Sequence, residues 1–78
     1  MNAEDILKQL RTELPECTVL MKYDAKQHSC DFIVSYVNGD FWYENTLGLN
    51  PYSIEDGALQ DDHINNFIYC FRRVIFHN

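Results

Sequence analysis

The sequence predicts a two-layer α+β domain in which an N-terminal and a C-terminal helix lie on one face of a three-stranded antiparallel meander. Two observations predict this fold. Apolar residues recur at helical spacing near both ends of the chain, and three segments between them alternate apolar with polar residues. The chain of 78 residues has room for one core, so residues 1–78 are expected to form a single domain. A hydrophobic content of 46% is typical of a folded chain.

The first helix is expected to begin after Asn2, whose side chain can cap it, and to stop at Pro15. Glu4 and Asp5 fall in its first turn, where the helix dipole favours negative charge. The side chains that face the core repeat at helical spacing, and they are Ala3, Ile6, Leu7, Leu10 and Leu14.

Three strands are expected to follow, over residues 17–23, 29–37 and 40–46. Asn38 and Gly39 supply the two positive-φ residues of a tight type I′ hairpin turn, which places Val37 opposite Asp40. Alternation then assigns two faces to the hairpin. The face toward the core carries Phe32, Val34, Tyr36, Phe41 and Tyr43, and the opposite face carries Asp31, Ile33, Ser35, Val37, Asp40, Trp42 and Glu44.

A loop is expected over residues 47–61, with the pattern of a capping box at Ser53-Ile54-Glu55-Asp56 that predicts a single helical turn inside it. Asp61 or Asp62 is expected to cap the last helix, and Arg72 and Arg73 lie near its negative C-terminal end. The apolar side chains of this helix repeat at helical spacing, and they are Ile64, Phe67, Ile68, Phe71 and Ile75.

Negative charge is concentrated in the middle of the chain. Twelve acidic and six basic residues leave a net charge of −6, and residues 27–71 contain seven acids without a Lys or Arg. A chain of this sign repels phosphate, which excludes ordinary binding to DNA or RNA. An acidic surface can serve solubility alone, but a merely soluble surface usually mixes both signs. The one-sided distribution instead predicts a field that steers the protein toward a basic surface of a protein partner.

Enzymatic chemistry is not expected from this sequence, and neither is a cofactor or a metal. No glycine-framed nucleophile stands near a histidine, and three scattered glycines form no phosphate-binding loop. The acids around Asp61-Asp62-His63 lack the spacing of a calcium loop. Zinc spacing is absent among the cysteines, which are expected to be reduced and mostly buried thiols of a cytosolic protein, at Cys17, Cys30 and Cys70. No apolar run is long enough for a membrane span.

Trp42 differs from its aromatic neighbours, because the register turns it away from the core and places it among acids. An outward Trp framed by carboxylates is typical of an anchor in a protein interface, whereas a platform for nucleic acid bases would be framed by Lys and Arg. The same order of elements occurs in double-stranded-RNA-binding domains. Residues 61–71 contain no Lys or Arg, however, so that analogy extends to the fold and not to the activity.

Three short motifs carry a resemblance to a known family: the Met1-Asn2 start with Asp5 opening a helix, the turn Val37-Asn38-Gly39-Asp40 with Tyr43 after it, and Phe67-Ile68 with Phe71 in the last helix. In these motifs the chain resembles the small acidic anti-CRISPR proteins of phages, in particular the type II-A inhibitors of the RNA-guided CRISPR nuclease. That resemblance implies a DNA mimic that occupies the basic site where the nuclease reads DNA, with Asn38, Gly39 and Asp40 in the contact. The acid-rich tail of that family is replaced here by Arg72 and Arg73, so the resemblance names no particular nuclease.

The function expected from the sequence is therefore inhibition of a protein partner, a CRISPR effector, through its basic nucleic-acid-binding groove, in the cytoplasm of a bacterial host. Two alternatives remain: an immunity or antitoxin protein that neutralises a toxin nuclease, and a structural subunit that dimerises through the face of Trp42. The residues expected to bind the partner are Asn38, Gly39, Asp40, Trp42, Glu44, Glu55, Asp56, Asp61 and Asp62.

Overall fold

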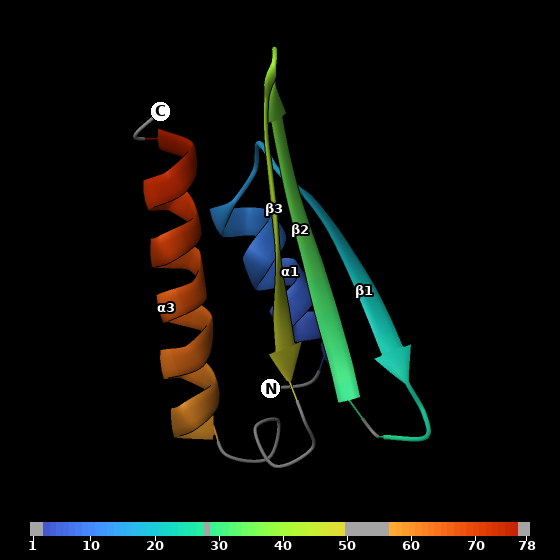
Figure 1. The fold of residues 1–78 in the computed structure, drawn as a ribbon. Helices are drawn as coiled ribbons and strands as arrows, with labels where there is room; N and C mark the ends of the chain where they lie inside the picture. The colour runs from blue at the N-terminus through green and yellow to red at the C-terminus, as the bar shows by residue number, and fades with distance from the viewer. Residues whose placement is uncertain (1–2, 28, 50–56, 77–78) are drawn as a thin grey trace.

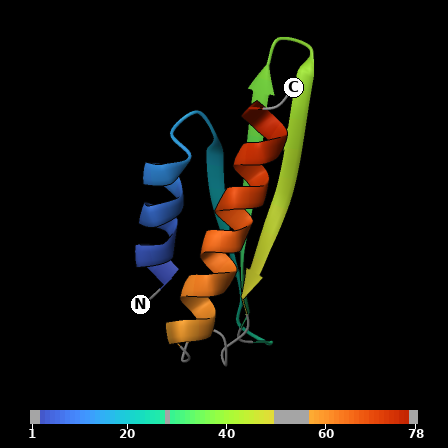
Figure 2. The same ribbon diagram turned by 90° about the vertical axis from the view of Figure 1, so that its left-hand side faces the viewer.

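The computed structural model describes residues 3–27, 29–49 and 57–76. Helix α1 (Ala3–Glu13) comes first, followed by strands β1 (Thr18–Asp24), β2 (Ser29–Asn38) and β3 (Phe41–Leu49), and helix α3 (Gly57–Phe76) ends the described chain. The strands form an antiparallel sheet in the order β1-β2-β3. Both helices lie on the same face of this sheet, α1 beside β1 and α3 beside β3 (Figures 1 and 2). The predicted α-β-β-β-α fold is confirmed.

The core lies between the sheet and the two helices. Helix α1 buries Ile6 and Leu10, the apolar stripe predicted for it, and Leu14 after the helix is buried as well. A turn then leads into β1, with the amide of Cys17 donating to the carbonyl of Leu14 at 3.0 Å. The buried side chains of the core are Ile6, Leu10, Leu14, Val19, Cys30, Phe32, Val34, Leu47, Leu49, Ile64, Ile68, Phe71 and Ile75.

Aromatic rings join β3 to α3. The rings of Tyr43 and Phe71 lie 4.8 Å apart between their centroids, and Phe67 lies 5.8 Å from Phe71 on the same helix. Both distances are within the range of favourable ring contacts. The two faces predicted for the β2–β3 hairpin are confirmed, since Phe32 and Val34 are buried against the helices and Tyr36, Phe41 and Tyr43 pack against the core.

The predicted hairpin turn is wrong by one residue. Asn38 pairs with Phe41, so Gly39 and Asp40 form the turn, and the pairing shifts by two residues relative to the prediction. Gly39 has a φ of 61°, which the first position of a two-residue hairpin turn requires. The observed register places Val37 opposite Trp42 and Ser35 opposite Glu44, so that side chains of similar polarity meet. The two faces are unchanged, because a shift of two residues preserves alternation.

Two predicted boundaries of the 47–61 loop are also wrong. Strand β3 continues to Leu49, because Leu47 and Leu49 pair with Phe32 and Cys30 and are buried in the core. Helix α3 begins at Gly57, before both predicted caps, Asp61 and Asp62, since the helix-forming residues 58–60 extend it toward its N-terminus. The capping box predicted at residues 53–56 lies outside the described residues.

Candidate functional site

The sheet face opposite the helices is covered by neither α1 nor α3 (Figure 1). Alternation along the strands turns large apolar side chains onto this uncovered face. Leu20 is 57% exposed, Val37 63% and Trp42 62%. Ile33 pairs with Leu20 on one side and with Thr46 on the other, and the neighbouring row of Thr18, Ser35 and Glu44 separates these residues from Val37 and Trp42. Apolar surface of this kind is the usual mark of a protein-binding face.

Trp42 lies near the turn of the β2–β3 hairpin and has a defined setting. Val37 stands directly across from it, and Glu44 is its neighbour along the same strand and face. The hydroxyl of Ser35 donates to a carboxylate oxygen of Glu44 at 3.1 Å, which fixes the acid beside the indole. Asp40 is exposed in the turn itself. We call Val37, Asp40, Trp42 and Glu44 the Trp42 cluster.

The structure brings together only part of the predicted partner-binding set. Asn38, Gly39, Asp40, Trp42 and Glu44 belong to one hairpin end. Asp61 and Asp62 are exposed on the N-terminal half of α3, and this part of the helix lies at the other end of the molecule from the hairpin turn (Figures 1 and 2). Glu55 and Asp56 lie outside the described residues. The described acids of the set therefore form two separate groups.

The other acids of the uncovered face, Asp31 and Asp24, each have a local partner. Lys22 pairs in register with Asp31, so opposite charges face one another across β1 and β2. Asp24 is engaged locally, because its carboxylate accepts hydrogen bonds from the amides of Lys26 and Gln27 at 3.0 and 3.3 Å. Glu44 on this face and Asp40 in the adjoining turn are therefore the acids best placed to meet a partner, and both belong to the Trp42 cluster.

Both edges of the sheet are blunted by polar side chains. At the β1 edge, the guanidinium of Arg11 donates to the carbonyl of Val19 at 3.2 Å. At the β3 edge, the amide of Thr46 donates to the side-chain oxygen of its own neighbour Asn45 at 2.8 Å. A main-chain group satisfied by a side chain is withdrawn from pairing with a further strand. One main-chain group at each edge is thereby unavailable to a further strand.

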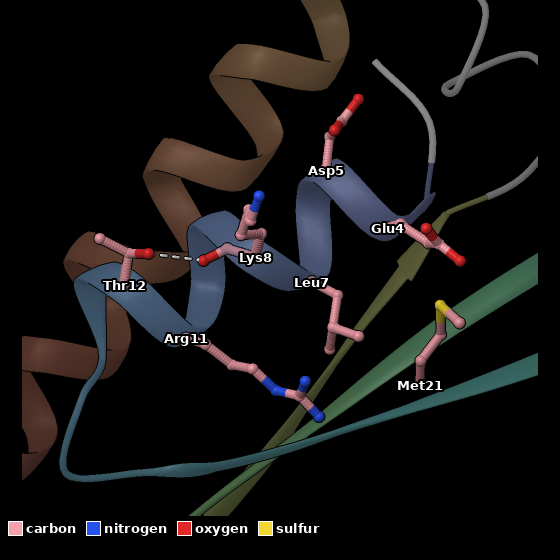
Figure 3. A pocket seen from close by; sticks show the side chains of 7 residues that line it. All are labelled: Glu4, Asp5, Leu7, Lys8, Arg11, Thr12 and Met21. Carbon is pink, nitrogen blue, oxygen red and sulfur yellow. Dashed lines mark hydrogen bonds between the residues drawn. The ribbon is translucent and has the colours of Figure 1, made fainter.

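A hollow of about 470 Å³ lies between α1 and β1 (Figure 3). Leu7 extends from the helix toward the sheet, Met21 extends from the strand toward the helix near Glu4, Arg11 reaches down toward the sheet, and Lys8 points away from it. The carboxylate of Glu4 also lines this hollow, so its lining mixes both signs of charge and provides no acidic site.

The described residues contain three free thiols and no group of three or more His, Cys, Asp or Glu side chains able to hold a metal. Burial, and secondarily the neighbouring carboxylate of Asp31, raises the pKa of the Cys30 thiol, and burial followed by Glu16 raises the pKa of Cys17. Both thiols are therefore protonated near neutral pH and are weak nucleophiles. The prediction that the cysteines are mostly buried is wrong for Cys70, which is exposed on α3.

The helix face carries a group of residues that the sequence analysis did not include in any site. Arg73 lies over the ring of Tyr69, and Arg72 over the ring of Phe76, with guanidinium carbons 5.7 and 5.8 Å from the ring centroids. Both pairs have the spacing i, i+4, which could have identified them as cation–aromatic pairs on one helix.

No protein-family model, curated protein or solved structure matches the chain. None of the described helices is both long and apolar enough to span a membrane.

Proposed function

We propose that the protein is a non-catalytic binding protein that holds a protein partner against the uncovered face of its sheet. The observation that carries this proposal is the exposure of Leu20, Val37 and Trp42 on one face that neither helix covers. Burial of these side chains against a partner would remove their apolar surface from water, at about 25 cal/mol for each Å².

The size of the face suits a protein better than a small molecule. The molecule measures 37 by 24 by 16 Å along its principal axes, and the sheet runs along the longest of them (Figure 1). Stable protein interfaces bury about 800 Å² on each partner, which is of the order of one broad side of this molecule. An open sheet face also offers little to a ligand that needs to be surrounded.

The Trp42 cluster indicates the chemistry of the partner. A guanidinium or ammonium group that lies over the indole would meet the carboxylates of Glu44 and Asp40 beside it. The partner is therefore expected to present Arg or Lys at this position, in keeping with the net charge of −6. Where such a basic surface normally holds nucleic acid, the protein would compete with that nucleic acid and inhibit the partner.

The narrower proposal is that the partner is a CRISPR effector and that the protein acts as an anti-CRISPR inhibitor in the bacterial cytoplasm. Its support is the hairpin end, where Asn38, Gly39 and Asp40 adjoin Trp42 and Glu44. Asp61 and Asp62 would take no part in the same contact, because they belong to the other end of the molecule. A toxin nuclease presents the same kind of basic surface and is the alternative partner for the same site.

Capture from a host lysate by the tagged protein tests the proposal. The partner captured by the wild type is identified and purified, and its affinity for the double variant Trp42→Ala/Glu44→Lys is compared with that for the wild type. We expect the dissociation constant to rise at least about a hundredfold, because an anchor Trp alone can contribute 2 kcal/mol or more. The matched control is Tyr23→Ala, which removes an equally exposed ring from the other face of the sheet.

Three outcomes would contradict the proposal. An unchanged affinity of the Trp42/Glu44 variant for the partner would show that the interface lies outside the uncovered face. An affinity that does not fall with rising salt would show that Glu44 and Asp40 make no electrostatic contribution to binding. A purified protein that forms a dimer, with the dimer lost in Trp42→Ala, would instead favour a subunit that assembles through this face.

A further inference from the structure

A second hollow, of about 330 Å³, lies on the helix side of the molecule, away from the uncovered sheet face. Glu13 at the end of α1 lines it, together with a run of side chains from the C-terminal half of α3. Its apolar lining includes Ile68, which is otherwise buried in the core. Tyr69 is 62% exposed and Phe76 54%, so two aromatic rings border the hollow without being covered.

Positive charge gathers around this hollow. Arg72 and Arg73 both line it, and they are the only Lys or Arg residues of the chain after Lys26. With Glu13, the charged groups of the lining sum to one positive charge, in a chain whose net charge is −6. The sign of this surface is therefore opposite to that of the molecule as a whole.

The two arginines are held by aromatic rings. Each guanidinium lies within 6 Å of a ring centroid one helical turn away, Arg73 over Tyr69 and Arg72 over Phe76. A guanidinium that stacks on a ring loses part of its motion but keeps its N–H groups free at the edge, where a carboxylate can accept two hydrogen bonds. Tyr and Arg are also the residues most enriched at the centre of protein interfaces.

We propose that this hollow, the α3 groove, binds an acidic peptide segment of a second protein. The carboxylates of the peptide pair with Arg72 and Arg73, and one of its aromatic or large aliphatic side chains rests on Ile68 between Tyr69 and Phe76. Charge complementarity selects the peptide, because this is a positive apolar surface on an acidic molecule. The protein then joins two partners, a basic one on the sheet face and an acidic one on the helix face, and the second contact does not depend on the first.

The test is a titration of the ¹⁵N-labelled protein followed by amide chemical shifts. The probes are the capped pentapeptides Glu-Glu-Phe-Glu-Glu, Glu-Glu-Gly-Glu-Glu and Lys-Lys-Phe-Lys-Lys, with pentathymidylate as a nucleic acid of similar charge. We expect the first peptide to shift the amides of residues 65–76 and of Glu13, to bind at least about fivefold more tightly than the glycine peptide, and to bind more tightly than the other two probes.

Matched variants separate the groove from the general charge of the protein. Arg72→Gln/Arg73→Gln and Lys22→Gln/Lys26→Gln each remove two positive charges, but only the first pair belongs to the groove. We expect the arginine variant to weaken binding of the acidic aromatic peptide at least tenfold and the lysine variant less than twofold. Tyr69→Ala is expected to weaken it, whereas Tyr23→Ala, which removes an equally exposed ring from β1, is not.

Each of the following results would overturn the proposal: equal losses in the arginine and lysine variants, shifts spread over all basic residues, equal binding of the glycine peptide, stronger binding of pentathymidylate, or no binding. Thermal unfolding of each variant, followed by circular dichroism, checks that the fold persists. A variant whose helix signal is lost is replaced by Arg72→Lys/Arg73→Lys, which keeps the charge but loses the planar donors and is expected to bind more weakly than the wild type.

Discussion

The extension of β3 to Leu49 can be tested by truncating Leu47. Its side chain is 2% exposed and pairs across the sheet with Phe32, which is fully buried. Replacing a buried Leu by Ala usually costs about 2–5 kcal/mol, from lost transfer energy and from the cavity left behind. A domain of this size has a total stability of about 4–12 kcal/mol, so Leu47→Ala is expected to remove about a sixth of it or more.

The assay is urea unfolding followed by far-ultraviolet circular dichroism, with thermal unfolding alongside. A loss of about 3 kcal/mol corresponds to a fall in Tm of about 12–24 °C for a domain of this length. The slope of the unfolding free energy against urea is expected to stay constant, since the fold itself is retained.

Leu20→Ala provides a control of identical chemistry. Leu20 is also in a strand, but it lies on the uncovered face with 57% of its surface exposed. We expect this variant to change the unfolding free energy by less than about 0.5 kcal/mol, as surface substitutions usually do. If Leu47→Ala cost less than about 1 kcal/mol, or no more than Leu20→Ala, residue 47 would not be in the core and β3 would end where the sequence predicted.

Three further predictions concern the hairpin turn and the thiols. Gly39→Ala is expected to lower the unfolding free energy by about 1 kcal/mol, because the backbone at a φ of 61° disfavours an L side chain although space is free around it. D-alanine introduced there by chemical synthesis is expected to leave the unfolding free energy unchanged. An equal loss with both enantiomers would contradict this turn. Iodoacetamide is expected to modify exposed Cys70 first and Cys30 last, as mass spectrometry of the native protein would show. Folding raises the pKa of the Cys17 and Cys30 thiols. The unfolding free energy is therefore expected to be independent of these thiols below about pH 8 and to fall as the pH rises above their unfolded pKa. An unfolding free energy that rises in this range would contradict the burial of the two thiols.

Sequence periodicity predicted the layers well because it depends on local geometry. Ile6 and Leu10 in α1, and Ile64, Ile68 and Phe71 in α3, recur at the spacing that places them on one side of a helix, and all are buried. Alternation assigned Phe32 to the core and Trp42 to the opposite face in the same way. The error in the turn did not change these assignments. Moving the turn by one residue shifts the strand pairing by two residues, and a shift of two leaves each side chain on the same face.

The ends of elements were predicted less well, because they depend on contacts distant in sequence. Leu47 and Leu49 follow polar residues and flank a glycine, which suggested a loop. They continue the strand because Phe32 and Cys30 on β2 offer them both main-chain pairing and a place in the core. Asn38-Gly39 had the composition of a turn pair, but Gly39 takes the first turn position, with a positive φ, while Asn38 stays in β2 and pairs with Phe41.

The candidate site divides along the same line. Charge sign and the position of Trp42 outside the core were properties of the sequence itself, because they require only residue types and alternation. Whether Asp40 and Glu44 adjoin the two acids of α3 depended on how this helix packs along the sheet. The C-terminal half of α3, which carries Arg72 and Arg73, lies toward the hairpin end, and the acidic N-terminal half lies at the other end (Figure 2). Local pattern therefore determined which side chains turn outward, and tertiary packing decided which of them meet, because proximity between distant segments comes from the burial of a shared core.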